Sequence, residues 1–309
     1  MKHAVIDLGS NTFHLLIVDK QGDTVETLVK EQIPAKIAKA GINQGIITKE
    51  AIERALTVLH GFRQQIDLYQ VEPAHVKAIG TSAIRNARNG NEFCQVIEKE
   101  TGISIEVIAG EREAELIYKG VCQALDLGTA PSLIMDIGGG SVEFIIGNAS
   151  RIFWKQSFEI GGQRLLEKFV HSDPISASAV QRMHHYFQEQ LLPLVNAAHQ
   201  YAPQTLVGSS GSFDTLTDMD YMYRFGRLPD PNQTDFDYSL EEFYRAYGLL
   251  TSLNHDERMA IPGMIELRAD MIVPAAILIQ QVLKSLNINR IRCSTYALKE
   301  GILAWLLGQ

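Results

Sequence analysis

The sequence contains little cysteine: Cys94, Cys122 and Cys293 are the three cysteines in a chain of 309 residues. They stand far apart, without the paired spacing of a zinc site or the even count of a disulfide framework, and the nine histidines show no ligand spacing either. Scattered single cysteines are typical of buried thiols in a reducing compartment. We therefore expect a cytoplasmic protein that is held together neither by disulfides nor by zinc.

Long apolar runs are also missing. The longest uninterrupted one is Met271–Ile279, whereas a helix needs about 20 apolar residues to cross a bilayer. The N-terminus offers only Lys2 and His3 before strand-like sequence, so we expect no secretory leader. These two features predict a protein without a membrane partner.

Positive charge is in short supply. The chain has 28 Lys and Arg residues against 36 Asp and Glu, a formal net charge of −8. A general nucleic-acid binder has a basic surface, so we expect no nucleic-acid partner. A smaller polyanion would need a local cluster of cations, and basic residues do stand beside the small-residue motifs described below: Lys36, Lys39, Arg85, Arg88, Arg164, Lys168, Arg268 and Lys299. Each of them could equally be a solvated surface charge.

The most informative feature that is present is an internal repeat. Val5–Ile17 (VIDLGSNTFHLLI) recurs as Ile134–Ile146 (IMDIGGGSVEFII), and each copy is an apolar run, an aspartate, a turn of small residues and a second apolar run. This pattern predicts a β-hairpin, and the amides of a small concave turn can bind phosphate oxygens. The side chains of Asn11, Thr12 and Ser141 supply further donors.

An aspartate stands at the mouth of each turn, Asp7 in the first copy and Asp136 in the second. Carboxylates there could hold, directly or through water, the Mg²⁺ that accompanies phosphates. A single glycine-rich hairpin is usually no more than a turn, but two copies with matching aspartates favour a phosphate site. The sequence thus predicts two halves that face each other across a phosphate.

The repeat also predicts the domain organisation. Hydrophobic content of 46% and charged content of 21% are those of a globular protein, and the length suffices for two domains. We place them at residues 1–124 and 125–309, with a hinge near Cys122–Pro131, because strands and helices alternate in both halves as in an α/β fold. The expected helices include 48–65, 91–101, 111–126, 162–170, 177–201, 240–251 and 268–286, with a loop at 221–238 and a third strand and turn at 206–216.

Glu113 is on an unexpected face of its helix. At about 100° per residue it falls on the side of Ile117 and Gly120, opposite Glu111 and Glu115. An inward carboxylate is costly unless it is paired or used. One interpretation is an ion pair in the core, or a helix that starts later and leaves the residue in a loop; the other is a base that deprotonates a water for attack on phosphorus.

Two further sets of residues have open interpretations. Glu143 follows the second turn and is either an outward charge on a strand or a metal or water contact beside Asp136. Arg85, Arg164 and Arg268 adjoin small-residue segments, and guanidinium groups suit phosphate oxygens and the charge of a transferring phosphoryl group.

At these residues the chain resembles a known family. The matching segments, in order, are VIDLGSNTFHLLI, GTSAIRNARN, AGEREAELIYKGV, MDIGGGSVEFI, IGGQRL, GSSGSFDTL, ELRAD and ALKEGIL. They resemble the exopolyphosphatase and guanosine pentaphosphate phosphatase family of the actin-like ATPase superfamily, and they span essentially the whole chain. The resemblance implies two ribonuclease-H-like domains with a catalytic cleft between them, Mg²⁺ dependence, and removal of a terminal phosphate from inorganic polyphosphate or guanosine pentaphosphate.

The resemblance also assigns roles. It implies that Glu113 is the catalytic base and that Asp136 and Glu143 hold Mg²⁺ and the attacking water. It assigns phosphate binding to Ser10, Asn11, Thr12, Arg85, Gly138, Gly139, Gly140 and Ser141. It further implies a homodimer, and the chain resembles the short members of the family, whose C-terminal helix, here about 297–309, we expect to return to the first domain.

The sequence departs from the family pattern outside these residues. The usual Gly-Gly-Leu-Arg-Glu-Gly is here Tyr296–Gly301 (YALKEG), the usual arginine and glycine pattern after the second strand is Lys36–Gly41 (KIAKAG), and the third turn at Gly208–Ser212 is rich in serine. Lysine is a point charge where arginine would grip phosphate as a fork. These differences bear on substrate preference.

The leading hypothesis is a Mg²⁺-dependent exopolyphosphatase in which Glu113 activates water, with the metal on Asp136 and with Asp7 and Glu143 as further ligands. A guanosine pentaphosphate 5'-phosphatase would use the same groups. A kinase of the superfamily would bind adenosine at the third turn, and a non-catalytic sensor would bind the same anions without turnover; the serine-rich turn and the presence of Glu113 and Asp136 disfavour both.

Overall fold

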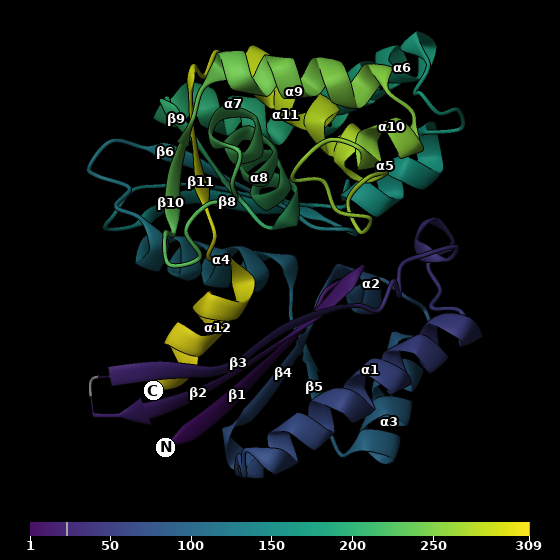
Figure 1. Cartoon of the computed structure of the whole chain (residues 1–309), viewed down its shortest axis with the longest axis vertical. Helices are drawn as coiled ribbons and strands as arrows, with labels where there is room; N and C mark the ends of the chain where they lie inside the picture. Colours follow the sequence, from purple (N-terminus) through teal and green to yellow (C-terminus); the bar gives the residue numbers. More distant parts are fainter. Residues whose placement is uncertain (23, 309) are drawn as a thin grey trace.

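The computed structural model describes residues 1–22 and 24–308 and contains two β-sheets, one above the other in Figure 1. The first sheet has the strand order β3-β2-β1-β4-β5. Its strands are β1 (Lys2–Leu8), β2 (Thr12–Gln21), β3 (Thr24–Pro34), β4 (Val76–Gly80) and β5 (Ile105–Val107). β1, β2 and β3 form an antiparallel meander, while β4 and β5 run parallel to β1.

The second sheet repeats this arrangement. Its order is β10-β11-β9-β6-β7-β8, from β6 (Ser132–Ile137), β7 (Val142–Gly147), β8 (Ile152–Phe158), β9 (Thr205–Ser209), β10 (Asp235–Tyr238) and β11 (Arg290–Ser294). β6, β7 and β8 form the meander, β9 and β11 continue in parallel on the other side of β6, and β10 adds an antiparallel edge. The expected fold class, α/β with two ribonuclease-H-like halves, is thereby confirmed.

Both predicted hairpins are present and in equivalent register. Asp7 pairs with His14 across β1 and β2, and Asp136 pairs with Glu143 across β6 and β7. Cross-strand partners have Cβ atoms only about 5 Å apart and point to the same face. The register therefore sets each aspartate beside its partner's side chain at the end of the sheet where the turn lies.

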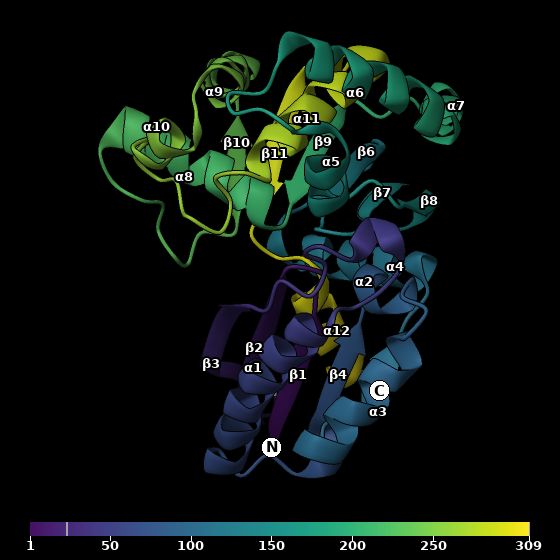
Figure 2. The ribbon, with the colours of Figure 1, turned by 90° about the vertical axis from the view of Figure 1, so that its right-hand side faces the viewer.

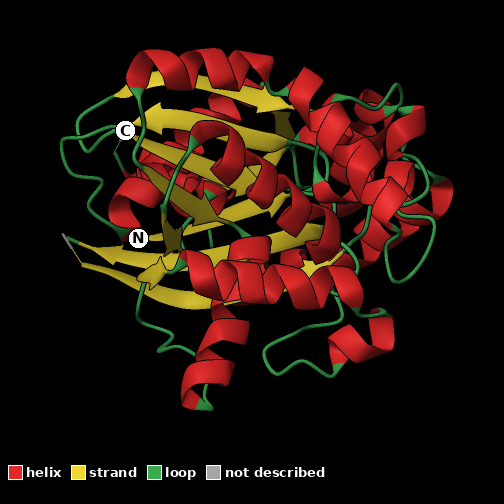
Figure 3. Cartoon of the chain, turned by 90° about the horizontal axis from the view of Figure 1, so that it is seen from above, coloured by secondary structure: helices red, strands yellow, loops and turns green. Residues whose placement is uncertain are grey.

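Helices cover the outer faces of the sheets, and seen from above they lie around most of the strands (Figure 3). In the first half α1 (Lys49–Leu68) and α3 (Gly90–Thr101) pack on one face and share a core with β1 and β2 (Figure 2). In the second half the apolar helix α11 (Ile272–Leu286) is central. Around it are α5 (Gly162–Phe169), α6 (Ala177–Gln190), α7 (Leu192–Tyr201), α8 (Gly211–Phe225), α9 (Leu240–Ser252) and α10 (His255–Met259).

Two helices lie between the sheets: α4 (Gly110–Ala124) and α12 (Leu298–Leu307), which is the C-terminal helix (Figure 1). They cross closely, because a Cβ on Gly301 would lie 1.8 Å from the carbonyl oxygen of Leu116 and one on Gly120 would lie 2.0 Å from that of Ala297. Glycine alone permits such an approach of two backbones. Their apolar side chains form a third core with residues of both sheets, among them Val5 and Ile134.

The remaining elements are short. α2 (Ser82–Arg85) follows β4, and two single turns of 3₁₀-helix occupy Ile42–Gln44 and Pro73–His75. Among the described residues we find no helix whose length and apolar content would let it cross a membrane, and the three cysteines are unpaired.

Several expected boundaries are wrong. The helix expected at 177–201 is interrupted at Leu191 between α6 and α7, where Pro193 removes a backbone donor. The segment 221–238 is not all loop, because α8 continues to Phe225 and β10 forms near the end of the segment. The third turn leads from β9 into α8, and α11 begins at Ile272 rather than at Arg268. The boundary between residues 124 and 125, just after α4, stays a prediction.

Candidate active site

The two repeated turns meet where the sheets face each other. An added Cβ on Gly140 would lie 2.5 Å from Ser10 Oγ and 2.6 Å from Ser82 Oγ, and one on Gly139 would lie 3.2 Å from Ser10 Cβ. The glycines of the second turn thus let the first turn and the start of α2 come within contact distance. The small residues in the repeat are required by this packing as well as by the turn itself.

A cleft opens beside this contact, with about 110 Å³ open to water-sized molecules. Most of the predicted site residues line it: Asp7, Ser10, Asn11, Thr12, Glu113, Asp136, Gly138, Gly139, Gly140 and Ser141. Two predicted residues do not. Arg85 lies behind Glu113, and Glu143 lies beside Asp136 on the neighbouring strand.

The second turn has its amides arranged for an anion. The carbonyl oxygens of Gly138 and Gly139 each accept a 2.9 Å hydrogen bond from an amide in the first turn of α5. The carbonyl oxygen of Gly140 accepts one of 3.2 Å from the amide of the N-cap residue of that helix. In a trans peptide the carbonyl and the following N–H point in opposite directions. The N–H groups of Gly139, Gly140 and Ser141 therefore point away from α5 and are available to an anion.

The first turn adds a hydroxyl group. Thr12 Oγ1 is buried and has no hydrogen-bond partner among the described residues, although Thr12 lines the cleft. A buried hydroxyl group without a partner is costly, and a phosphate oxygen in the cleft would satisfy it.

The carboxylates of Asp7, Glu113 and Asp136 line the cleft together, and that of Glu143 lies beside Asp136. Burial, reinforced by the neighbouring carboxylates, raises the pKa of Asp7 to about 8. Burial likewise raises the pKa of Glu113 to about 7 and that of Asp136 to about 6, and it raises the pKa of Glu143 well above its ordinary value. Ser209 Oγ donates to Asp136 Oδ2 at 2.7 Å and Ser157 Oγ to Glu143 Oε1 at 2.7 Å, so both carboxylates are oriented.

This cluster fits a divalent cation. Asp7 Oδ1 is buried without a hydrogen-bond partner in the described part of the chain, and the ionised carboxylates would repel one another without a positive charge between them. Among the described residues no three Asp, Glu, His or Cys side chains converge on one metal position, so the protein forms no complete cage. Mg²⁺ is commonly held by one or two carboxylates, with water and substrate phosphates completing the octahedron, and Asp7 and Asp136 suit that role.

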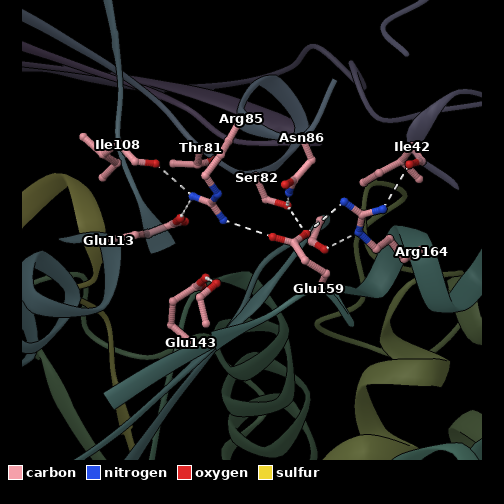
Figure 4. A network of polar contacts seen from close by, with 12 residues as sticks. Ile42, Thr81, Ser82, Arg85, Asn86, Ile108, Glu113, Glu143, Glu159 and Arg164 are labelled. Carbon is pink, nitrogen blue, oxygen red and sulfur yellow. Dashed lines mark hydrogen bonds and ion pairs between the residues drawn. The ribbon is translucent and has the colours of Figure 1, made fainter. Parts of the chain in front are cut away.

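Glu113 combines the two interpretations of its inward position. It is 6% exposed, lines the cleft, and accepts a 2.8 Å bond from Arg85 Nη1. Arg85 Nη1 also donates to the carbonyl oxygen of Ile108 at 3.1 Å and Arg85 Nη2 to Glu159 Oε1 at 3.2 Å (Figure 4). Glu113 is thus ion-paired on one side and open to a ligand on the other.

Two buried cations also line the cleft. Arg268 is 7% exposed, and its Nε has no partner among the described residues. It packs against the start of α8, where a Cβ on Gly211 would lie 1.9 Å from Arg268 Nη2. Lys299 lines the cleft as well and pairs with Glu300 at 3.0 Å. Asp214, a lining residue that sequence reasoning missed, has its pKa raised by burial, so the cleft mixes carboxylates and cations.

Sequence reasoning also missed His14, which lines the cleft. Burial, followed by the charges of Lys299 and Arg268, lowers the pKa of His14 to about 3, so the imidazole is neutral at pH 7. A signal was present, because His14 holds the same position in the first repeat as Glu143 in the second.

Arg164, by contrast with Arg268, does not line the cleft but donates hydrogen bonds to Gly140, Ile42 and Glu159.

Comparisons with known proteins agree with this description. A model of the Ppx/GppA phosphatase family matches residues 16–309. The crystal structure of an exopolyphosphatase from Cytophaga hutchinsonii is 48% identical, covers 100% of this chain and 98% of its own, and superposes with a TM-score of 0.96. A Haemophilus influenzae protein provisionally assigned as an exopolyphosphatase is 28% identical over 97% of this chain and 90% of its own length.

A second kind of relative is also similar. A guanosine-5'-triphosphate,3'-diphosphate pyrophosphatase from Vibrio vulnificus is 32% identical over 217 residues. This match covers 70% of the present chain and 43% of the Vibrio protein. The chain thus matches less than half the length of that relative.

Proposed function

The chain belongs to the Ppx/GppA phosphatase family, and from this premise we propose that it is an exopolyphosphatase that hydrolyses the terminal phosphate of inorganic polyphosphate with Mg²⁺. The single observation that carries the mechanism is Glu113, a buried carboxylate that lines the cleft beside the two phosphate-binding turns. With a pKa of about 7, Glu113 is close to the optimum for a base that works at neutral pH.

The residues divide the work as follows. The amides of Gly139, Gly140 and Ser141 and the hydroxyl group of Thr12 hold the terminal phosphate, and Glu113 orients a water and takes its proton as the water attacks phosphorus. Asp7 and Asp136 would hold the metal, with Glu143 beside Asp136. When bound, Mg²⁺ offsets the charge on the transferring phosphoryl group and polarises its oxygens.

The cations of the cleft support a chain of phosphates as the substrate. Phosphates next to the terminal one along a polyphosphate could pair with Arg268 and Lys299, which line the same cleft. The 48% identical relative from Cytophaga hutchinsonii carries the name of an exopolyphosphatase, which favours the inorganic chain over the nucleotide.

Guanosine pentaphosphate remains the second candidate substrate, because the Vibrio vulnificus relative carries the name of an enzyme for that class of compound. The terminal phosphate of either substrate would meet the same turns and the same base. A cytoplasmic location and a homodimer complete the proposal, and light scattering of the purified protein tests the latter.

The test is phosphate release in the presence of Mg²⁺ from long-chain polyphosphate and from guanosine pentaphosphate. The wild type should release phosphate from polyphosphate, and Glu113→Gln should lower kcat by about 100-fold or more, the usual contribution of a general base. Glu111→Gln, an exposed neighbour on the same helix, is the matched control and should retain activity. Faster release from the nucleotide would establish the second candidate, and binding without release from either would indicate a sensor.

A further inference from the structure

Glu159 connects the two halves of the molecule beside the cleft. It lies between β8 and α5, and its carboxylate accepts three bonds: 2.7 Å from Ser82 Oγ, 3.2 Å from Arg85 Nη2 and 2.9 Å from Arg164 Nη2 (Figure 4). Ser82 and Arg85 belong to α2 in the first half, whereas Arg164 belongs to α5 in the second. One carboxylate thus collects a hydroxyl group and two guanidinium groups.

The donors are held in place without Glu159. Arg164 donates from Nε to the carbonyl oxygen of Gly140 at 2.8 Å and from Nη1 to that of Ile42 at 3.0 Å. Arg85 is fixed by Ile108 and Glu113 through its other nitrogen. The two arginine side chains are 15% and 17% exposed, whereas that of Glu159 is 41% exposed. The two guanidinium groups therefore keep their positions without Glu159, and the carboxylate of Glu159 is the group that water or another anion can replace.

The donor set is one that recognises phosphate. Two guanidinium groups and a hydroxyl group that converge on one oxyanion bind a carboxylate or a phosphate equally well in geometric terms, and phosphate carries more charge. The two cations are balanced by Glu113 and Glu159, so the cluster has no net charge to attract an anion. Glu113 is needed as the base, so Glu159 is the carboxylate that an incoming phosphate would displace.

We propose that Ser82, Arg85 and Arg164 form an oxyanion subsite for a phosphate group and that Glu159 occupies this subsite in the free protein as an internal competitor. The proposal rests on the proposed function, because Arg85 joins the subsite to Glu113. The ligand is a phosphate group of the substrate chain or the orthophosphate released next to Glu113. Glu159 thereby sets how tightly the protein holds phosphate anions.

The experiment is calorimetric titration of Glu159→Gln and the wild type with inorganic tripolyphosphate and, separately, with orthophosphate, in EDTA so that no metal is present. The amide keeps the shape of the side chain and removes the competing charge. We expect the Kd of Glu159→Gln to be about two- to tenfold lower than that of the wild type. This range corresponds to the free energy that one or two partly exposed ion pairs contribute. A gain with tripolyphosphate alone assigns the subsite to the substrate chain, and a gain with orthophosphate alone assigns it to the product.

Two variants make the test specific. Glu167→Gln removes the same charge from the adjoining helix α5. Glu167 also reaches the first half, because it accepts a 2.9 Å hydrogen bond from the Ala40 amide, but it forms no ion pair with an arginine among the described residues. The Kd of Glu167→Gln should therefore equal that of the wild type. Adding Arg164→Gln to Glu159→Gln should abolish the gain.

A Kd that is unchanged or higher in Glu159→Gln overturns the proposal, since Glu159 would then only fasten the two halves together. Phosphate release with Mg²⁺ in the same proteins keeps the two proposals apart. Tighter binding without any release would refute the hydrolase and leave the subsite, whereas release with an unchanged Kd would refute the subsite alone.

Discussion

At the scale of single residues, the site is defined by side chains that the rest of the protein leaves unsatisfied. Asp7 Oδ1, Thr12 Oγ1 and Arg268 Nε are buried atoms without partners among the described residues, and all three residues line one cleft. A buried polar atom without a partner costs free energy. Under the proposed function, a bound phosphate and its cation would satisfy these three atoms together.

The raised pKa of Asp7 predicts how stability depends on pH. The folded protein holds the Asp7 proton up to a pKa of about 8, against an ordinary value of 3.8, so between these pH values the unfolded chain is ionised while the folded protein is not. The contribution of Asp7 to the stability of the metal-free protein should therefore fall as pH rises through this window. Mg²⁺ should raise Tm more at pH 8 than at pH 5.

Asp7→Asn removes this ionisation. Its metal-free Tm at pH 8 should exceed that of the wild type by a few degrees, since about 1 kcal/mol shifts Tm by about 2–4 °C in domains of this size, and its response to Mg²⁺ should shrink. Scanning calorimetry with and without Mg²⁺ measures both, with the exposed Asp67→Asn as control. A wild-type Tm that ignores Mg²⁺ at pH 8 would contradict the assignment of Asp7 as a ligand.

At the scale of elements, the crossing of α4 and α12 leaves no room for a side chain. Gly301→Ala would push its Cβ against the backbone of Leu116 and should lower the free energy of unfolding by about 1–3 kcal/mol or more, as overpacking does. Gly61→Ala on α1 has nothing within 4 Å of the new Cβ and should raise stability by about 0.5–1 kcal/mol. Urea denaturation of both variants checks this; equal effects would show that the helices separate freely.

The elements that sequence predicted well are those with strong local signals. The two hairpins were readable because a repeated apolar pattern surrounds each turn, and the inward face of Glu113 followed from helical periodicity alone. β10 was missed because its four residues alternate acidic and aromatic side chains after a proline-containing loop. Its strand conformation comes from pairing with β11, which is distant in the sequence.

The site was predictable to the same degree and for the same reason. Asp7, Asp136 and Glu113 stand in or beside the repeat or on a periodic face, so their convergence could be inferred. Glu159 carries no local signal, because its proposed role depends on arginines from two helices, α2 and α5. Arg268 lines the cleft and Arg164 does not. This difference could not be predicted either, because it depends on how the helices pack.

At the scale of the whole molecule, the third core makes the two halves one unit. Val5 and Ile79 of the first sheet and Ile134 and Val207 of the second share it with Ile302 of α12. Breaking the contact between the halves would expose this shared apolar surface to water. We expect one calorimetric transition, with equal calorimetric and van't Hoff enthalpies. Two transitions would contradict this and would indicate that each half holds its own fold.

The position of α12 in the chain has a further consequence for synthesis. Ile302 is fully buried in the third core, to which Val5 and Leu116 also belong, yet α12 is synthesised after all of the other described elements. Until then the nascent first half carries an uncovered apolar face along β1 and α4. Completion of the third core therefore waits for the synthesis of α12, the last of the described elements.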